Sequence, residues 1–460
     1  MKALCLQKNA GKSMAIAEQI HRKKHMTSFQ IIILSFAPVI LAGAALLMLP
    51  ISSKNAVVTP FHETLFTAVS AACVTGLVVK DTASHWSLFG QGVILLLIQI
   101  GGMGVVTVAA AIAGISGKKI SLMQRSTMQE AIAAPKMGGI VKLTGFIIKA
   151  TLLFELFGAL AMAPVFYPEY GIRGLWMAVF HSVSAFCNAG FDLMGTPEAP
   201  FVSLTSYEQN PVVNTVIMLL IILGGIGFLT WEDIWTNKLR FKRYRMQSKV
   251  ILTTTLILLV FPAIYFYQYE FMKLPFGERL WCSLFQSVTP RTAGFNTADL
   301  TKLTGAGQCI IIILMLIGGS PGSTAGGMKT TTAAVLLGNA FAVFCRKEDA
   351  RFFGRRTEAD AIKHAATILA MYLALFVSAA LLISIWEGLP MGTCLFETAS
   401  AIGTVGLTLG ITPGLGRFSQ ALLMILMFFG RVGGLTLIYA ALPGTGRNYS
   451  RLPQEKITVG

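Results

Sequence analysis

Charged residues are scarce in this chain of 460 residues, because Asp, Glu, Lys and Arg together make up 13% of it while hydrophobic residues make up 54%. That balance excludes a soluble enzyme of this length. The apolar residues form long runs, including Phe29–Pro50, Phe89–Ile115, Leu143–Pro164 and Val250–Tyr265. Because a helix needs about 20 apolar residues to cross a bilayer, the sequence predicts an all-α polytopic membrane protein.

Cysteine and histidine are also few. The seven cysteines include no Cys-x-x-Cys pair, which leaves neither a disulfide framework nor a zinc site. The six histidines include no His-Glu-x-x-His motif, so a zinc protease is excluded. The chain also lacks a P-loop and a strand-led Gly-x-Gly-x-x-Gly motif. We therefore expect no enzyme activity and no covalent cofactor, and any regulation by a nucleotide must come through another chain.

The net charge of +16 raises the question of nucleic-acid binding, and the distribution of the basic residues answers it. They gather before the first apolar run and in loops between runs: Arg22, Lys23 and Lys24; Lys118, Lys119 and Arg125; Lys238, Arg240, Lys242, Arg243, Arg245 and Lys249; and Arg346, Lys347, Arg351, Arg355 and Arg356. This pattern is the positive-inside bias of membrane proteins. It predicts a cell-membrane protein with cytoplasmic termini and an uncleaved first helix, and no nucleic-acid partner.

Four related phrases recur along the chain, each centred on a glycine. They are "FTAVSAACVTGL" around Gly76, "HSVSAFCNAGF" around Gly190, "FQSVTPRTAGF" around Gly294 and "FETASAIGTVGL" around Gly406. Each glycine precedes a large apolar residue. A second glycine phrase follows inside the next apolar run, beginning at Gly101, Gly224, Gly318 and Gly430. Such recurrence indicates a fourfold internal repeat.

The segment before each first glycine, such as Pro60–Val74, is too short to cross a bilayer. Non-helical backbone at membrane depth is tolerated only where it is buried or lines a water-filled cavity. We therefore predict that each repeat consists of a helix, a half-crossing helix followed by an extended segment that returns to the same face, and a second helix. The predicted fold is eight transmembrane helices and four re-entrant loops around one central pore. The expected units are residues 1–28, four repeats at 29–116, 139–231, 249–345 and 359–443, and a tail at 444–460.

Glycine at these four positions suits an ion filter. Backbone carbonyl oxygens replace the hydration shell of K⁺ in channels, and glycine reaches the backbone conformations that this requires. The candidate filter residues are Val74, Thr75, Gly76, Asn188, Ala189, Gly190, Thr292, Ala293, Gly294, Thr404, Val405 and Gly406. The alternative is that these are helix-packing glycines, an interpretation that fits the second set of phrases better than the first.

The phrases "VTGL", "NAGF", "TPRTAGFN" and "GTVGL", each between two apolar runs, resemble the four pore loops of the Ktr/Trk/HKT superfamily of K⁺ transporters, and the whole chain is most similar to its KtrB-type subunits. The resemblance implies K⁺ as the substrate, since a serine in place of Gly76 is associated there with Na⁺ preference. It also implies Na⁺-dependent uptake, a homodimer and a KtrA-type cytosolic ring of nucleotide-binding subunits. The basic loops are on the side that would meet such a ring or bind anionic lipid headgroups.

The third repeat has an apolar run from about Gln308 to Cys345 that is interrupted by "GGSPGSTAGGMKT". That composition cannot hold a regular helix. We interpret the interruption as a gate, which matches the intramembrane loop of KtrB-like proteins, with a simple kink or external loop as the alternative. Its candidate residues are Gly318, Gly319, Ser320, Gly322, Ser323, Thr324, Gly326 and Gly327, together with Arg431 from the last run.

Arg431 is expected to face the bundle interior, because a charge at the bilayer centre is costly. There it would repel cations or bond the carbonyls of a glycine loop; the alternative is that it only ties two helices. Lys329 is expected to snorkel or to pair with a carboxylate, and Arg291 is expected to anchor its own loop. Glu63 and Glu397 are expected to anchor half-crossing helices, and Asp192 either attracts cations at the mouth or is a solvated surface acid.

Two other functions remain compatible with the residues. One is a Na⁺ or unselective cation transporter of the same fold. The other is a rocking secondary transporter, which would have two inverted halves with paired broken helices. Only the third repeat shows an evident helix break in the sequence, and the repeat is fourfold. We therefore favour a channel-like K⁺ pathway.

Overall fold

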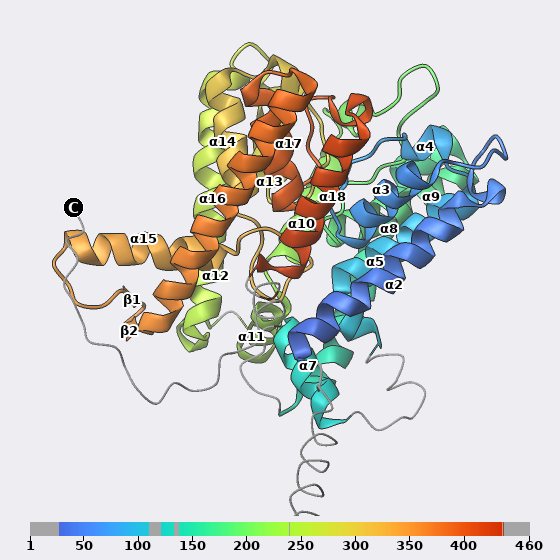
Figure 1. Ribbon diagram of the computed structural model, residues 1–460. Helices are drawn as coiled ribbons and strands as arrows, with labels where there is room; N and C mark the ends of the chain where they lie inside the picture. The colour runs from blue at the N-terminus through green and yellow to red at the C-terminus, as the bar shows by residue number, and fades with distance from the viewer. Residues whose placement is uncertain (1–26, 110–120, 133–137, 239, 435, 437–460) are drawn as a thin grey trace, which may run out of the picture.

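A computed structural model of the chain describes residues 27–109, 121–132, 138–238, 240–434 and 436. Within these residues the regular structure is helical except for one antiparallel hairpin, β1 (Arg351–Phe352) and β2 (Arg355–Arg356), in which Arg351 lies opposite Arg356 (Figure 1). The predicted helical class is confirmed. The predictions for Arg22, Lys23, Lys24, Lys118, Lys119 and the tail 444–460 fall outside the described residues.

Each repeat begins with a long apolar helix. These are α2 (Ser28–Met48), α8 (Ile140–Tyr170), α12 (Met246–Tyr265), which continues as the π-helical turn η4 (Phe266–Glu270), and α16 (Ala359–Glu387). All four are long and apolar enough to cross a membrane. Their outward faces expose large apolar side chains, for example Phe157 at 60%, Phe261 at 68% and Ile385 at 79%. An exposed apolar surface of this kind fits lipid surroundings.

A short helix follows each long one and ends at a first glycine phrase. The four short helices are α3 (Phe61–Ala72), α9 (Ile172–Phe186), α13 (Phe276–Val288) and α17 (Met391–Gly403). Prolines stand immediately before three of them, at Pro60, Pro275 and Pro390. In the second repeat Gly171, with φ of 59°, separates α8 from α9. These residues stand at the N-terminal ends of the short helices and set the direction in which each begins, because proline fixes φ and glycine reaches left-handed backbone.

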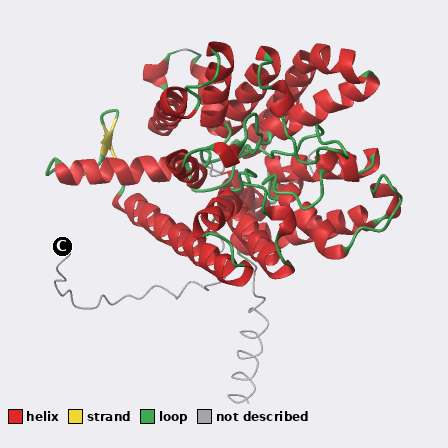
Figure 2. Cartoon of the chain, turned by 90° about the horizontal axis from the view of Figure 1, so that it is seen from above, coloured by secondary structure: helices red, strands yellow, loops and turns green. Residues whose placement is uncertain are grey.

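The second helix of each repeat contacts the short helix of the next repeat. The second helices are α5 (Leu88–Met103), α10 (Pro211–Gly225), α14 (Gly305–Leu316) and α18 (Arg417–Val432). Three have N-terminal caps, in which Ser87, Asn210 and Thr304 accept backbone N–H groups. Helix α5 contacts α9, α10 contacts α13, α14 contacts α17, and α18 returns to contact α3. The four repeats therefore form a closed ring, with loops at its centre (Figure 2).

The prediction that only the third repeat breaks its second helix is wrong. Helix α5 is capped at its C-terminal end by Gly104 and α18 by Gly433, while Gly227 separates α10 from the next helix; these glycines have φ of 84°, 90° and 90°. After Gly227 the chain bends by 97° into α11 (Phe228–Asn237). The reason is positional, because the fourth residue of each of these three phrases is a glycine at positive φ, a conformation that ends the helix.

The third repeat has the longest break, from 317 to 329, between α14 and α15 (Thr330–Phe344). Helix α15 extends sideways from the body at the end that also carries α11 and the hairpin (Figure 1). The remaining elements are short connections: η1 (Pro50–Ser52), α4 (Thr82–His85), α7 (Leu122–Ile132), η2 (Thr205–Tyr207), η3 (Phe241–Arg243), η5 (Leu300–Lys302) and η6 (Thr412–Gly414).

Candidate ion pathway

Four glycine loops follow the short helices: loop 1 (74–77), loop 2 (188–191), loop 3 (292–295) and loop 4 (404–407). They share one backbone conformation. The residue two before each glycine is left-handed, with φ of 58° at Val74, 59° at Asn188, 65° at Thr292 and 51° at Thr404. The glycines are also at positive φ, namely 91° at Gly76, 70° at Gly190, 79° at Gly294 and 93° at Gly406. Non-glycine residues rarely adopt this region, so its fourfold recurrence indicates a built site.

The loops meet one another around the centre of the molecule. If a Cβ atom were added to each glycine, it would lie against a carbonyl oxygen of the next loop, which belongs to the residue just before that loop's glycine. The distances would be 2.4 Å from Gly76 to Ala189, 2.6 Å from Gly190 to Ala293, 2.2 Å from Gly294 to Val405 and 2.2 Å from Gly406 to Thr75. Because the fourth contact returns to loop 1, the sequence of contacts closes. All twelve predicted filter residues therefore lie in this one ring, which we call the glycine ring.

Hydroxyl groups on the short helices hold the glycine ring in shape. The N–H groups of Gly76 and Gly406 donate to Ser70 Oγ (3.1 Å) and Ser400 Oγ (3.0 Å). In the other two repeats the hydroxyl donates instead: Ser184 Oγ to the Phe191 carbonyl (2.7 Å) and Thr289 Oγ1 to the Phe295 carbonyl (2.5 Å). Loops 1 and 4 thus differ from loops 2 and 3 in how they are bonded.

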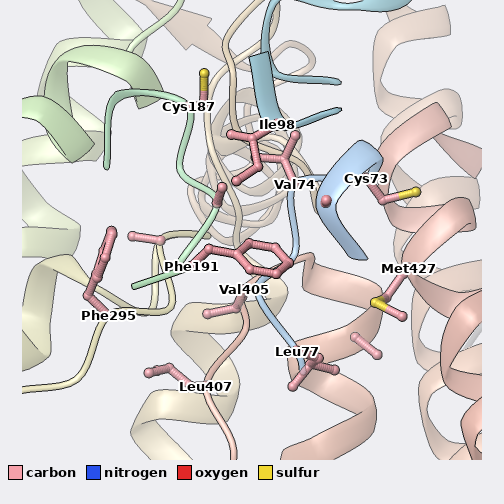
Figure 3. Close-up of a cluster of buried hydrophobic side chains, with 14 of the residues drawn as sticks. Cys73, Val74, Leu77, Ile98, Cys187, Phe191, Phe295, Val405, Leu407 and Met427 are labelled. Carbon is pink, nitrogen blue, oxygen red and sulfur yellow. The ribbon is translucent and has the colours of Figure 1, made fainter. Parts of the chain in front are cut away.

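The large residue after each glycine is buried behind the ring. Leu77, Phe191, Phe295 and Leu407 are each at most 1% exposed. Figure 3 shows them among buried neighbours such as Val74, Val405 and Met427. These side chains fix each loop from behind and leave its backbone as the surface that faces the neighbouring loop.

Polar side chains of the short helices also bind the chain beyond the ring. Glu397 accepts from Thr408 Oγ1 at 2.9 Å and from Thr412 Oγ1. Glu63 pairs with Lys80 at 3.3 Å. In the other two short helices His181 and Gln286 play this part, and the sequence did not point to either. His181 Nε2 accepts from the Leu193 N–H at 3.3 Å, and Gln286 Nε2 donates to Asn296 Oδ1 at 3.2 Å. The signal available was a polar residue directly after a phenylalanine in α9, α13 and α17, namely His181, Gln286 and Glu397.

Three threonine hydroxyls in the glycine ring have no partner within the described structure. Thr75, Thr292 and Thr404 are all fully buried, and the Oγ1 atom of each lacks a hydrogen bond. An unsatisfied buried oxygen is costly unless something else supplies a positive partner. The C-terminal ends of the short helices, which carry partial negative charge, also meet the ring. Oxygens and helix ends together form a site suited to a dehydrated cation.

A cavity of about 210 Å³ opens on one side of the glycine ring. All four ring glycines line it, together with Asp81, Asp192 and Asp299. Burial raises the pKa of Asp192 to about 7, opposed by a hydrogen bond from the Met194 N–H and reinforced by the charge of Asp81. The hydroxyl of Thr301 lowers the pKa of Asp299. Both acids lie in connections outside the spanning helices, so this cavity is an acidic vestibule.

The 317–329 loop lies against the other side of the ring. Its backbone is braced by the Gly318 N–H, which donates to the Met328 carbonyl at 2.8 Å, and by the Thr330 N–H, which donates to Gly319 at 3.0 Å. A Cβ on Gly326 would lie 2.0 Å from Thr404 Oγ1, and Thr324 Oγ1 lies 3.0 Å from Asn188 Oδ1. The loop therefore contacts loops 2 and 4 directly.

Arg431 joins this loop to the first repeat. Its guanidinium donates to the carbonyl oxygens of Thr324 and Gly101, and to that of Gly102 at 3.0 Å. Lys329 folds back to donate to the Ala325 carbonyl at 2.8 Å. Both cations border a second cavity of about 260 Å³ on the far side of the loop from the ring. The loop and Arg431 therefore lie between that cavity and the glycine ring.

The other predicted gate residues divide by what they contact. Ser320 Oγ is 3.0 Å from Thr330 Oγ1, and Ser323 Oγ donates to the Ser320 carbonyl at 2.7 Å, so both serve the loop itself. Gly322 faces α7, where an added Cβ would lie 2.6 Å from the Ile132 carbonyl.

Arg291 is 4% exposed and donates to Thr255 Oγ1 on α12 at 3.3 Å, which places its guanidinium behind loop 3.

The ring and the acidic vestibule offer oxygen atoms and negative charge that suit a cation, and comparison with known families identifies proteins that transport cations. The sequence profile of the TrkH family, described as cation transport proteins, matches residues 2–445. The chain therefore belongs to the TrkH family of cation transport proteins, and the resemblance to Ktr/Trk transporters is confirmed.

Individual relatives are similar to this chain over almost its whole length. The chain is 40% identical to the potassium/sodium uptake protein NtpJ of Enterococcus hirae, over 95% of this chain and 98% of that protein. It is 38% identical to the Ktr system potassium uptake protein B of Bacillus subtilis, over 94% and 96%. The crystal structure of the potassium transporter TrkH from Vibrio parahaemolyticus matches with a TM-score of 0.72, over 93% of this chain and 87% of that one, at 18% identity. That likeness shows a shared fold.

Proposed function

We propose that this protein is a channel-like K⁺ uptake protein of the cell membrane. The observation that carries the proposal is the closed glycine ring, in which four carbonyl oxygens alternate with four left-handed glycines. Such oxygens replace the hydration shell of K⁺. The names of two relatives, a potassium/sodium uptake protein of E. hirae and a potassium uptake protein of B. subtilis, support K⁺ as a substrate.

In this proposal the chain crosses the membrane eight times. The long helices and the second helices are the spans, and the short helices with their glycine loops enter from one face and return to it. The acidic vestibule is then the outer mouth. The second cavity, beside α7 and the 317–329 loop, is the inner one.

The filter comprises residues 74–76, 188–190, 292–294 and 404–406. The gate comprises the 317–329 loop and Arg431, because these groups separate the inner cavity from the ring. The guanidinium adds a repelling positive charge and holds the loop by its Thr324 carbonyl. Both effects would keep the pathway shut.

The words "Ktr system" in the name of the B. subtilis relative support a regulatory partner subunit. We propose a homodimer served by a KtrA-type cytosolic ring, with Na⁺ required for full uptake. Regulation by a nucleotide would pass through that ring. The exposed arginines of the β1–β2 hairpin lie at the inner end of the molecule, where such a ring or anionic lipid headgroups would meet them (Figure 1).

The second candidate is uptake of both K⁺ and Na⁺, and the name of the NtpJ relative, a potassium/sodium uptake protein, favours it. A rocking secondary transporter has less support. The helix breaks at Gly104, Gly227 and Gly433 recur around a fourfold ring, whereas that mechanism uses paired breaks in two inverted halves.

Competition for ⁸⁶Rb⁺ uptake into proteoliposomes tests the proposal. The purified protein should take up ⁸⁶Rb⁺, and external K⁺ should compete at far lower concentration than external Na⁺. Equal competition by the two ions would favour the second candidate. Absence of uptake, with protein-free vesicles as the control, would contradict both.

A further inference from the structure

The side chain of Thr324 bonds the 317–329 loop to loop 2 of the glycine ring. Its Oγ1 lies 3.0 Å from the Phe186 carbonyl oxygen and 3.0 Å from Asn188 Oδ1. All three residues are at most 1% exposed. A threonine hydroxyl has one hydrogen to donate, so it is shared between these two acceptors. Both acceptors belong to the end of α9 and the start of loop 2.

Asn188 differs from the residues at the equivalent place in the other loops, which are Val74, Thr292 and Thr404. Its Nδ2 donates to the Ile221 carbonyl at 3.4 Å and to the Arg291 carbonyl at 3.3 Å. The amide therefore touches α10, the residue before loop 3, and the 317–329 loop. Within the described residues, Asn188 is the residue of the glycine ring whose side chain hydrogen-bonds a side chain of the 317–329 loop.

Moving the loop aside would change what loop 2 offers to an ion. The Phe186 carbonyl ends α9, where the helix carries partial negative charge. Without the Thr324 hydroxyl, this oxygen and Asn188 Oδ1 would both be buried acceptors lacking a donor, and a cation could supply the missing positive partner. Loop position and ion binding at loop 2 are then linked, and such a linkage acts in both directions.

We propose that the hydrogen bond between Thr324 and Asn188 couples the gate to ion selectivity. Thr324 is a positioning residue that acts through Asn188: its hydroxyl fixes the amide while the loop is closed, and its departure frees two oxygens at the inner end of the filter. This inference rests on the proposed filter and gate. It adds that the ion preference of the ring depends on the state of the loop.

The test is uptake by the full-length Thr324→Val protein in proteoliposomes, with K⁺ and Na⁺ as competitors of ⁸⁶Rb⁺. Valine matches threonine in shape but lacks the hydroxyl. We expect uptake to rise by about fivefold and the preference for K⁺ over Na⁺ to fall by about fivefold, as the loss of one net hydrogen bond allows. Thr324→Ser should retain both wild-type properties, because it keeps the donor.

Thr367→Val is the matched control, because it makes the same change on α16, where the Thr367 hydroxyl bonds the Lys363 carbonyl of its own helix and touches neither the ring nor the 317–329 loop. It should leave the ion preference unchanged. If Thr324→Val does not fold, as judged by its elution profile, Thr324→Ala removes the same hydroxyl without adding volume. In a double-mutant cycle with Asn188→Ala, the effects of the two substitutions on ion preference should be non-additive.

The results that would overturn the coupling differ from those that would overturn the proposed K⁺ filter. Faster uptake by Thr324→Val with an unaltered K⁺ preference would overturn the coupling and leave the filter and gate intact. Additive effects in the double-mutant cycle would do the same. If the wild-type protein itself had no preference for K⁺, the proposed K⁺ filter would fail, and the coupling with it.

Discussion

At the scale of single residues, backbone oxygens form the ring and carboxylates lie only beyond it. The carbonyl oxygens of Thr75, Ala189, Ala293 and Val405 each face the glycine of a neighbouring loop. Within the described residues, no three His, Cys, Asp or Glu side chains gather as a metal site would require. Carbonyl oxygens arranged in a ring suit an ion that must bind weakly enough to leave again.

Arg431→Ala should raise the rate of K⁺ uptake by about tenfold or more. The substitution removes the bonds to Thr324 and Gly101 and a positive charge beside the ion path. Two like charges 4 Å apart repel by about 4 kcal/mol at an effective dielectric constant of 20, and each 1.4 kcal/mol is worth about tenfold in rate. The exposed Arg417, at the start of the same helix, supplies the control Arg417→Ala. An unchanged rate in Arg431→Ala would exclude Arg431 from the barrier.

The affinity for external K⁺ should depend on pH through Asp192. Its raised pKa of about 7 means that the carboxyl is largely protonated at pH 6 and charged at pH 8. A full charge near the mouth is worth about 1 kcal/mol at 4 Å in water, or about fivefold in affinity. Uptake at low K⁺ should therefore increase from pH 6 to pH 8, and Asp192→Asn should abolish that increase.

Asp299→Asn is the control for this pH dependence. Because the pKa of Asp299 is lowered, its carboxylate stays charged throughout the range. The variant should keep the pH dependence of the wild type while weakening K⁺ affinity at every pH. A pH dependence that survives in Asp192→Asn would assign the titration to another group.

Residue identities allowed the glycines and Arg431 to be predicted, but not what they touch. The left-handed conformation of Val74 has no signal in the sequence, since a β-branched residue disfavours it. The bond between Thr324 and Asn188 joins positions far apart in the chain. The expectation that Lys329 snorkels or pairs with a carboxylate missed its bond to the Ala325 carbonyl, because folding back in this way depends on the shape of the loop.

At the scale of elements, the 317–329 loop is an ordered segment fitted between helices. The N–H groups of Ser320 and Thr324 donate to the Gly225 and Gly224 carbonyls at 2.9 and 3.2 Å. The Gly327 N–H donates to the Gly430 carbonyl at 3.3 Å. The second helices of repeats 2 and 4 thus provide, next to their breaks, the carbonyls that hold this loop, so the breaks and the proposed gate form one assembly.

Gly326→Ala should push the loop away from the ring and increase uptake severalfold. The added Cβ would lie 2.0 Å from Thr404 Oγ1 and 3.0 Å from the Thr404 Cβ and Cγ2 atoms, and real Cβ atoms are not found so close to a neighbour. Gly305→Ala is the control, because an added Cβ there meets nothing within 4 Å. Reduced uptake with normal protein yield would show that the loop closes the pathway further when displaced.

Element boundaries show where sequence reasoning succeeds and where it stops. The long break in repeat 3 could be predicted because Pro and several Gly residues occur together. Gly104, Gly227 and Gly433 are glycines inside apolar runs, where a helix tolerates them. Their breaks depend on tertiary contacts, such as the Phe228 N–H, which donates to the Gly322 carbonyl at 2.7 Å.

At the scale of the whole molecule, the fourfold repeat becomes a ring because each second helix contacts the following short helix and α18 closes on α3. The sequence predicted four equivalent units. It did not predict the order of contacts or the two bonding patterns of the ring, in which Gly76 and Gly406 donate to serines and Ser184 and Thr289 donate to carbonyls. Those depend on how neighbouring units pack.

The most direct test of the central claim is the K⁺-to-Na⁺ preference of Gly76→Ser, measured by ⁸⁶Rb⁺ competition in proteoliposomes beside Gly92→Ser. Gly92 lies on α5 with nothing within 4 Å of an added Cβ, whereas at Gly76 that atom would lie 2.4 Å from the Ala189 carbonyl oxygen. The account predicts that Gly76→Ser loses its preference for K⁺ while Gly92→Ser keeps it. An unaltered preference in Gly76→Ser would mean that the glycine ring is a packing arrangement and that selectivity lies elsewhere.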